Sequence, residues 1–277
     1  MTIRVAYLGP PGTYTEEAAL QYAPGAHLIP VPSISAVAEA IHRGVADEGV
    51  VPIENSLEGS VNDTVDLLIQ EETLFIRQEL VLKVVHCLIV KPGTKLKEIE
   101  VVYSHPQALA QCRGWLDNRV PRAQRMGSLS TAAAVEQVLS SEVKAAAVGT
   151  QRAAGLYGAE VLAQGIQDSV VNMTRFVVLA FEDHEPTGQD KTSLCFSFGN
   201  DRPGLLFGVI AEFASRNINL AKVESRPTKE TLGRYIFLID FEGHRQDKLI
   251  SEALVMVEKL AGTIRILGSY PRWQEMI

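Results

Sequence analysis

Short apolar runs alternate with amphipathic segments along the first two thirds of the chain. Runs typical of buried strands lie at residues 3–8, 49–52, 80–90, 99–103, 144–148, 160–163 and 170–181. Segments with helical spacing or an alanine-rich composition lie between them, at 17–22, 35–42, 60–68, 108–116, 131–139 and 151–156. This alternation up to residue 181 predicts an α/β fold with a mostly parallel sheet.

The pattern changes after residue 191. Strands are predicted at 192–198, 219–226, 234–241 and 263–267, with helices at 201–215 and 246–260. The order strand-helix-strand-strand-helix-strand predicts a ferredoxin-like βαββαβ domain. The preceding segment contains Pro186, Gly188 and several acidic residues. We therefore expect a first domain at 1–182, a linker at 183–191 and a second domain at 192–277.

One polar interruption stands out in the last apolar run of the first domain. Residues 172–176 (NMTRF) place a hydroxyl and a guanidinium inside a strand, where both are costly without partners. In one interpretation, Thr174 is simply a β-forming residue and Arg175 a salt-bridged residue at the sheet edge. In the other, Arg175 and Thr174 together bind a ligand carboxylate. The pentapeptide alone leaves both interpretations open.

A hydroxyl residue stands at several predicted strand-to-helix turns, at Thr13, Ser60, Ser104, Ser130 and Thr150. Helix N-termini expose unpaired N–H groups and the positive end of the helix dipole. If several meet in one crevice at the carboxyl ends of the strands, they form an anion site with few basic residues. Each hydroxyl taken alone is equally typical of a simple helix cap.

Composition narrows the class of partner. The chain has 277 residues, of which 46% are hydrophobic and 21% charged, and its net charge is −7. We expect no nucleic-acid or membrane partner, because no basic run or long apolar segment occurs. Neither a signal peptide nor a metal-ligand spacing is evident, which predicts a cytoplasmic protein without a metal. Three scattered cysteines, Cys87, Cys112 and Cys195, are expected to be buried thiols.

Six motifs together resemble the prephenate dehydratase family, which joins a catalytic domain to a regulatory ACT domain. They are residues 9–14 (GPPGTY), 51–56 (VPIENS), 103–109 (YSHPQAL), 130–133 (STAA), 172–176 (NMTRF) and 224–227 (ESRP). The resemblance implies a two-lobed catalytic domain similar to type II periplasmic binding proteins. Lobe 1 would hold about 1–80 and 165–182, and lobe 2 about 81–164.

The resemblance also implies the site residues. Catalytic roles fall to Thr174, Arg175, Phe176, His105 and Glu54, with Phe176 expected to pack beneath the substrate ring. Substrate-binding roles fall to Thr13, Asn55, Ser56, Gly59, Ser60, Ser104, Gln107, Ser130, Thr131 and Asn172. Binding of L-phenylalanine as an allosteric inhibitor falls to Gly204, Leu205, Leu206, Asn217, Asn219, Glu224 and Ser225. Leu205 departs from the small residue usual in the family, which places effector affinity in question.

The implied reaction converts prephenate into phenylpyruvate, CO2 and water, and needs no cofactor because aromatisation drives it. Arg175 would bind one carboxylate and Thr174 would hydrogen-bond the leaving hydroxyl. The pKa of a threonine hydroxyl is too high for a proton source, so His105 and Glu54 are the candidate acids.

Two other functions stay open: the same chemistry on arogenate, and a non-catalytic amino-acid sensor. Family members are dimers or tetramers, so a homodimer or homotetramer is expected. Because no mutase-like helical segment precedes residue 3, the chain is expected to be monofunctional.

Overall fold

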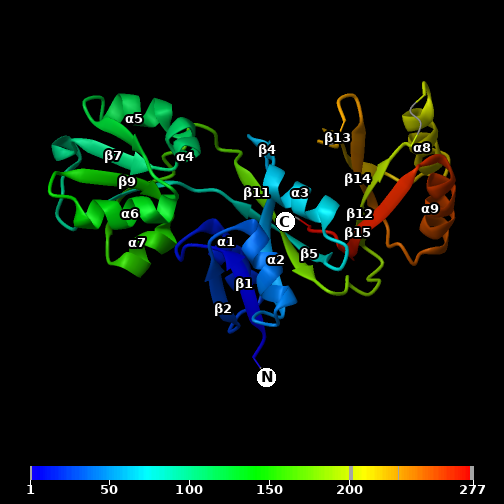
Figure 1. Cartoon of the computed structure of the whole chain (residues 1–277). Helices are drawn as coiled ribbons and strands as arrows, with labels where there is room; N and C mark the ends of the chain where they lie inside the picture. The colour runs from blue at the N-terminus through cyan, green and yellow to red at the C-terminus, as the bar shows by residue number, and fades with distance from the viewer. Residues whose placement is uncertain (1, 200–201, 230, 275–277) are drawn as a thin grey trace. The chain divides into compact units, whose positions relative to one another are not determined.

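The structure is a computed structural model that describes residues 2–199, 202–229 and 231–274. The chain divides into two compact units. One holds the residues up to Asn62 together with Val81–Phe176, and the other holds Asp63–Leu80 together with the residues from Val177 onward. Two strands of Figure 1, β5 (Phe75–Lys83) and β11 (Met173–Ala180), contribute residues to both units.

The first sheet has the strand order β2-β1-β3-β11-β5, and β4 pairs with β3. The elements before β5 are β1 (Arg4–Leu8), α1 (Tyr14–Tyr22), β2 (His27–Val31), α2 (Ile34–His42), β3 (Glu48–Asn55), β4 (Gly59–Ser60) and α3 (Asn62–Gln70). Strand β1 runs parallel to β2 and β3. Helix α2 buries Ile34, Val37, Ala38 and Ile41 against β1 and β3, because the spacing i, i+3, i+4, i+7 puts them on one face.

The second sheet has the order β10-β6-β9-β7-β8. Its strands are β6 (Cys87–Val90), β7 (Val101–Ser104), β8 (Gln124–Gly127), β9 (Ala145–Gly149) and β10 (Glu160–Gln164). Its helices are a 3-10 turn at Leu96–Glu98, α4 (Pro106–Gln111), α5 (Arg113–Arg119), α6 (Thr131–Ser140) and α7 (Gln151–Tyr157). Figure 1 shows α4 and α5 on one face of this sheet and α6 and α7 on the other, where each pair covers its own apolar core.

The prediction of one mostly parallel sheet is wrong, because the chain builds two mixed sheets instead. Strand β7 is parallel to β8 and β9, whereas β6 is antiparallel to β9 and β10. The strand predicted at 80–90 is divided into β5 and β6, because Val84 and His86 direct their N–H groups to Asn172 O and Gln167 Oε1 rather than into a sheet ladder. The predicted helix 108–116 is likewise divided, since α4 ends at Gln111 and α5 begins at Arg113.

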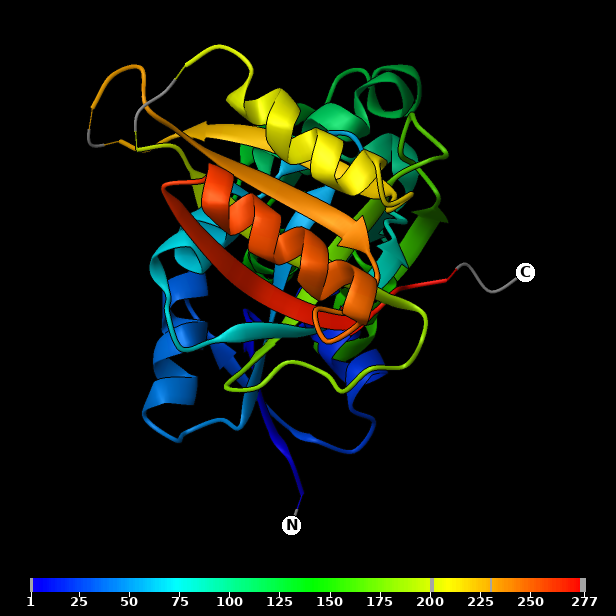
Figure 2. The ribbon, with the colours of Figure 1, turned by 90° about the vertical axis from the view of Figure 1, so that its right-hand side faces the viewer.

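The C-terminal domain confirms the predicted ferredoxin-like order. It contains β12 (Asp190–Ser197), α8 (Leu205–Ala214), β13 (Leu220–Pro227), β14 (Tyr235–Glu242), α9 (Lys248–Leu260) and β15 (Thr263–Pro271). The strands form an antiparallel sheet in the order β13-β14-β12-β15. Figure 2 shows α8 and α9 lying across one face of it, over a core that includes Phe196, Phe213 and Phe241. The helix start predicted at residue 201 lies outside the described residues.

Two acidic residues of the segment 63–80, Asp66 and then Glu79, form ion pairs with the C-terminal domain inside the second unit. Asp66 on α3 accepts from Arg226 at 2.8 Å and from Lys229 at 2.6 Å. Lys191 on β12 donates to both carboxylate oxygens of Glu79 on β5, at 2.8 and 2.9 Å. The Glu79 side chain is 1% exposed, so this second pair is buried.

In the part of the chain that the structure describes, no helix has the length and apolar character needed to cross a membrane.

Candidate active site

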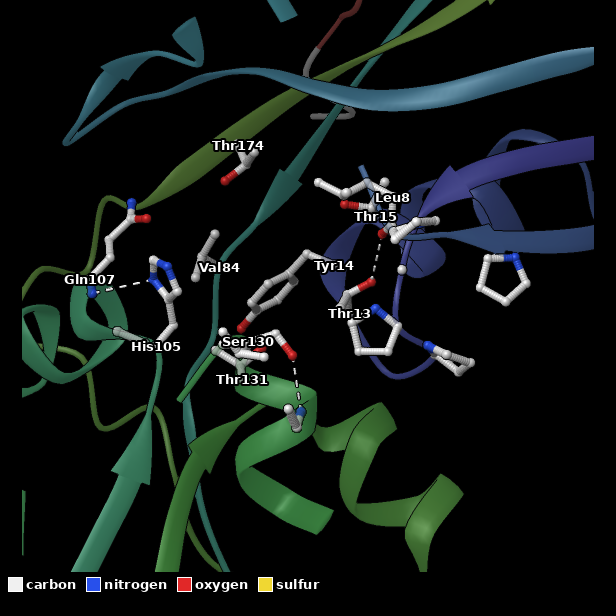
Figure 3. Close-up of a pocket in the computed structure, with 18 of the residues that line it drawn as sticks. Leu8, Thr13, Tyr14, Thr15, Val84, His105, Gln107, Ser130, Thr131 and Thr174 are labelled. Carbon is white, nitrogen blue, oxygen red and sulfur yellow. Dashed lines mark hydrogen bonds between the residues drawn. The ribbon is translucent and has the colours of Figure 1, made fainter. Parts of the chain in front are cut away.

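A cavity of about 820 Å³ lies within the first unit and is lined by elements of the first two sheets. Its wall comes from the turn after β1 and the start of α1, the ends of β2 and β3, Val84 and His86, helix α4, the first turns of α6, and one residue of β11. Figure 3 shows Thr174 above the space, His105 and Gln107 on one side, Thr13 on the other and Ser130 below. Cavities of this size accommodate small organic ligands.

Two helices of normal length begin at the cavity wall with a hydroxyl cap. Thr13 Oγ1 accepts from Glu16 N at 3.4 Å at the start of α1. Ser130 Oγ accepts from Ala133 N at 3.0 Å at the start of α6. Both residues line the cavity, so the positive ends of two helix dipoles are directed to one space. The predicted meeting of hydroxyl-capped helices is confirmed for these two.

The other predicted caps have different roles. Ser104 is fully buried and donates to Val148 O at 2.6 Å, so the prediction that it caps the next helix is wrong. His105 takes that position, and its Nδ1 accepts from Gln107 N at 3.4 Å. Thr150 caps α7 as predicted but does not line the cavity. Proline at the first position of α4 explains the shift, since it fixes where that helix starts.

The β3–β4 hairpin brings one predicted residue to the cavity. Asn55 lines it, whereas Ser56, Gly59 and Ser60 do not. Ser56 instead joins the hairpin to β11: its N–H donates to Met173 O at 2.9 Å, and its Oγ accepts from Met173 N at 3.0 Å. These contacts hold the end of β3 beside the start of β11.

Arg175 and Phe176 do not line the cavity. Arg175 Nε lies 3.7 Å from Glu54 Oε2, and its side chain is 13% exposed. Phe176 is 1% exposed and belongs to the core rather than to a ligand-facing surface. Among the described residues that line the cavity, none is a lysine or an arginine. Arg175 follows Thr174 directly in the chain but is not one of the residues that line the cavity.

A chain of side-chain amides runs from Thr174 to a buried histidine. Asn55 Nδ2 lies 2.9 Å from Thr174 Oγ1 and 2.9 Å from Asn172 Oδ1. Asn172 Nδ2 donates to Gln111 Oε1 at 2.9 Å. The same oxygen lies 2.9 Å from His86 Nε2. Five residues from four parts of the sequence thus form one hydrogen-bonded network at the cavity wall.

His86 is 3% exposed at the start of β6. The Tyr14 ring meets its ring edge-on, with the centroids 6.0 Å apart. Burial lowers the pKa of His86, and the hydrogen bond with Gln111 opposes that shift only in part, so the imidazole is neutral at physiological pH. Tyr14 donates its own hydroxyl to Val85 O at 2.8 Å.

A second network holds the turn after β1. Glu16 Oε2 accepts from Gly12 N at 2.7 Å and from Arg152 Nε at 2.6 Å. Burial disfavours the charged carboxylate, but these hydrogen bonds outweigh it and lower the pKa of Glu16. Gly12 has a φ of +86°, and a Cβ there would lie 3.0 Å from the Cβ of Ala153. Glycine is therefore required at this position by both conformation and space.

The three cysteines are buried and free, which confirms the prediction. Burial raises the pKa of Cys87 and of Cys195 to about 11 and that of Cys112 to about 12, so all three are protonated thiols at neutral pH. Within the described residues, no cluster of three or more histidine, cysteine or acidic side chains is arranged to hold a metal ion.

Sequence reasoning missed His86, Gln111 and Tyr14, which all line the cavity. One signal was available for Gln111: it follows Gln107 by four residues, so the two amides share one face of α4. No local signal marks His86, because its partner Gln111 is 25 positions away.

The predicted effector residues lie at the start of α8, just after its end, and on β13. Gly204 is its N-cap, with a φ of +91°, and Leu205 and Leu206 form its first turn. Asn217 and Asn219 follow its C-terminus, and Glu224 and Ser225 lie on β13. Helix α8 has 10 residues, about 15 Å of helix, which separates Gly204 from Asn217 and Asn219 within one copy of the domain.

Comparison with known proteins identifies the family. Residues 5–184 match the family model for prephenate dehydratase, and residues 196–255 match that for the ACT domain. The bifunctional chorismate mutase/prephenate dehydratase of Aquifex aeolicus is 40% identical over 271 residues, which cover 98% of this chain and 74% of that protein. The chloroplastic arogenate dehydratase/prephenate dehydratase 1 of Arabidopsis thaliana is 41% identical over 286 residues, covering 97% of this chain and 72% of that protein.

The solved structures agree. The crystal structure of a prephenate dehydratase from Arthrobacter aurescens in complex with L-Phe has a TM-score of 0.90 and 36% sequence identity, and the match covers 98% of this chain and 90% of that one. The fold therefore defines a two-lobed α/β dehydratase followed by an ACT domain. The chain belongs to the prephenate dehydratase family of carbon-oxygen lyases.

Proposed function

We propose that the protein converts prephenate to phenylpyruvate, CO2 and water and that L-phenylalanine inhibits it through the ACT domain. The observation that carries this proposal is Thr174, held at the wall of an 820 Å³ cavity by a hydrogen bond with Asn55. The family membership supports the same reaction. In this proposal the catalytic domain is 1–182, the linker 183–191 and the ACT domain 192–277, and the enzyme works in the cytoplasm.

The hydroxyl of Thr174 is poised to donate. An amide nitrogen has no acceptor capacity, so Asn55 Nδ2 donates and Thr174 Oγ1 accepts in their contact. The Thr174 proton is therefore directed elsewhere, and Figure 3 shows the hydroxyl facing the cavity. In the reaction this O–H stabilises the departing ring hydroxyl as negative charge develops on it.

The two carboxylates of prephenate need positive potential. The N-termini of α1 and α6 supply part of it without a formal charge. Arg175 supplies the formal charge in our proposal, which requires its guanidinium to exchange Glu54 for a substrate carboxylate. His105 is the better candidate than Glu54 for the acid that converts hydroxide to water, because His105 lines the cavity and Glu54 does not.

The effector site in this proposal lies between copies of the chain, in a homodimer or homotetramer. In that arrangement the start of α8 in one copy would face β13 of the other. The Arthrobacter relative that binds L-Phe supports the choice of effector.

Arogenate is the second candidate substrate, because a relative from Arabidopsis thaliana carries both substrate names. Prephenate and arogenate differ only in a keto or an amino group on the side chain. A non-catalytic amino-acid sensor is the third candidate, and Thr174 with its intact network argues against it.

The deciding experiment measures phenylpyruvate formation from prephenate by the purified protein, with and without L-phenylalanine. We expect turnover that L-phenylalanine suppresses. Turnover that L-phenylalanine does not suppress would support the catalytic assignment and would point to Leu205 as the cause of the lost inhibition. Turnover of arogenate but not of prephenate would make arogenate the substrate. Turnover of neither compound would favour the non-catalytic amino-acid sensor. Thr174→Val should abolish turnover, whereas the matched variant Thr174→Ser should keep part of it, because serine retains the hydroxyl.

A further inference from the structure

The orientation of every side chain in the amide network can be derived from fixed backbone donors. Amide oxygen and nitrogen atoms are normally assigned from their neighbours. Here Asn55 Oδ1 accepts from the backbone N–H groups of Leu57 at 3.0 Å and Glu58 at 3.2 Å. A backbone N–H can only donate, so Asn55 Oδ1 must face these two groups. The Asn55 nitrogen is thereby turned toward Thr174 and Asn172.

The orientation of the Asn55 amide determines the orientation of each following side chain in the network. Asn55 Nδ2 only donates, so the atom it meets at 2.9 Å is the oxygen of Asn172. The nitrogen of Asn172 must then face Gln111, and it donates to Gln111 Oε1 at 2.9 Å. Since Gln111 presents an oxygen, His86 Nε2 carries a hydrogen and donates to it.

Two consequences follow at the ends of the network. The oxygen of Gln111 is occupied by two donors, from Asn172 and His86, so its amide nitrogen is left to face the cavity that Gln111 lines. At the other end, Thr174 Oγ1 is an acceptor toward Asn55 and a donor toward the cavity. The network thus turns two hydrogen-bond donors toward the space where a dianion would bind.

We infer that Asn172 and His86 are positioning residues that together hold Gln111 Oε1 and so fix the donor orientation of Gln111, with His86 held as the neutral Nε2–H tautomer. Neither acts on the substrate directly. Asn172 is 0% exposed and does not line the cavity, which differs from its predicted role as a substrate ligand. The Nδ1 atom of His86 is buried and has no hydrogen-bond partner among the described residues. This agrees with a neutral imidazole that carries its hydrogen on Nε2.

The inference about the reaction rests on the proposed function, but the tautomer does not. The first test is therefore ¹⁵N NMR of the histidine-labelled full chain, with the His86 signals assigned by their loss in His86→Gln. We expect the Nε2–H tautomer at pH 7. An Nδ1–H tautomer or a charged ring would overturn the derived orientation, whether or not the protein turns over prephenate.

The second test separates donor orientation from packing. His86→Gln keeps an N–H donor that can reach Gln111, whereas His86→Leu keeps only bulk. We expect kcat/KM for prephenate within about threefold of wild type for His86→Gln and a loss of about tenfold or more for His86→Leu.

Equal losses in the two variants would overturn the positioning role. Circular dichroism melts of both variants check that they are folded. Asn172→Leu is an independent test, because it removes a different hydrogen bond of the same network. In Asn172→Leu we expect His86 to populate both neutral tautomers, because Gln111 loses the partner that sets its direction. A His86 signal unchanged from wild type in that variant would also contradict the inference. Absence of turnover by the wild-type protein would instead refute the proposed function.

Discussion

Thr174 and Arg175 are neighbours on one strand that serve different surfaces. A β-strand sends successive side chains to opposite faces, so Thr174 reaches the cavity and Arg175 meets Glu54 behind it. The motif that contains both residues therefore combines a hydroxyl that faces the cavity with a guanidinium on the opposite side of the strand. Their functions can be separated by substitution.

Arg175→Ala should lower kcat/KM for prephenate by about 100-fold, equivalent to about 3 kcal/mol of transition-state binding. The reason is that a desolvated carboxylate would lose its only formal positive partner in the proposed complex. Steady-state kinetics of the variant checks this. Glu54→Gln is the matched control, since it alters the same ion pair and leaves the cation. Near-native turnover in Arg175→Ala would exclude the anchor role.

Glu16 should make stability depend on acid pH. Its pKa is lowered in the folded protein, so its contribution is present above the unfolded value of about 4.3 and is lost as the pH falls through the folded pKa. We expect Glu16→Gln to cost about 1–3 kcal/mol at pH 7 and progressively less below pH 4. Urea unfolding of both proteins across this range measures the difference. A gap that does not change with pH would contradict the ion-pair origin.

The sequence predicted the residues of the site better than their partners. Thr13, Asn55, His105, Ser130 and Thr174 were found because each stands in a short motif at the end of an element. The network around them joins residues as far apart as Asn55 and Thr174, 119 positions, and sequence periodicity carries no information on such contacts. The mixed second sheet was missed for the same reason, since strand direction depends on pairing between distant segments.

Helix α3 is the element that connects the hairpin of the site with the effector motif. It begins two residues after β4, and its Asp66 binds Arg226, which follows Ser225 in the chain. The Arg226 side chain is 10% exposed and also lies 3.7 Å from Glu224. A change in the orientation of β13 would therefore act directly on α3 through a partly buried ion pair.

Asp66→Asn should weaken inhibition by L-phenylalanine, raising the half-inhibitory concentration by about three- to tenfold, because Arg226 loses a charged partner worth about 1 kcal/mol. Basal kcat/KM should remain within about twofold. Inhibition curves at fixed prephenate measure both quantities. Lys229→Ala is the control, since the contact of its 64% exposed side chain with Asp66 is screened by solvent. The same inhibition curve in Asp66→Asn as in wild type would rule out this connection.

At the scale of the whole molecule, the units defined by packing differ from the regions defined by sequence. The match to the prephenate dehydratase family runs over residues 5–184, yet Asp63–Leu80 packs with the residues from Val177 onward. The buried pair of Glu79 and Lys191 lies inside that second unit. Glu79 also accepts from Trp273 N at 2.9 Å.

Lys191→Met should lower the free energy of unfolding by about 3–5 kcal/mol, because it leaves a buried carboxylate without its cation. Denaturant unfolding measures the loss. The double variant Lys191→Met with Glu79→Leu should recover most of it, since an apolar pair of similar volume removes the uncompensated charge. A double variant as unstable as the single one would show that packing, rather than charge, explains the loss.

The buried pair also limits how this protein can be recombined with others. A chimera that exchanges everything after residue 184 for another ligand-sensing domain would discard Lys191 and Trp273 N but retain Glu79. The recipient would carry a buried carboxylate that has lost its lysine cation and one backbone donor, at a position distant in sequence from the junction. A transplantable sensor for this scaffold must therefore bring a lysine on its first strand, or the acceptor strand must change with it.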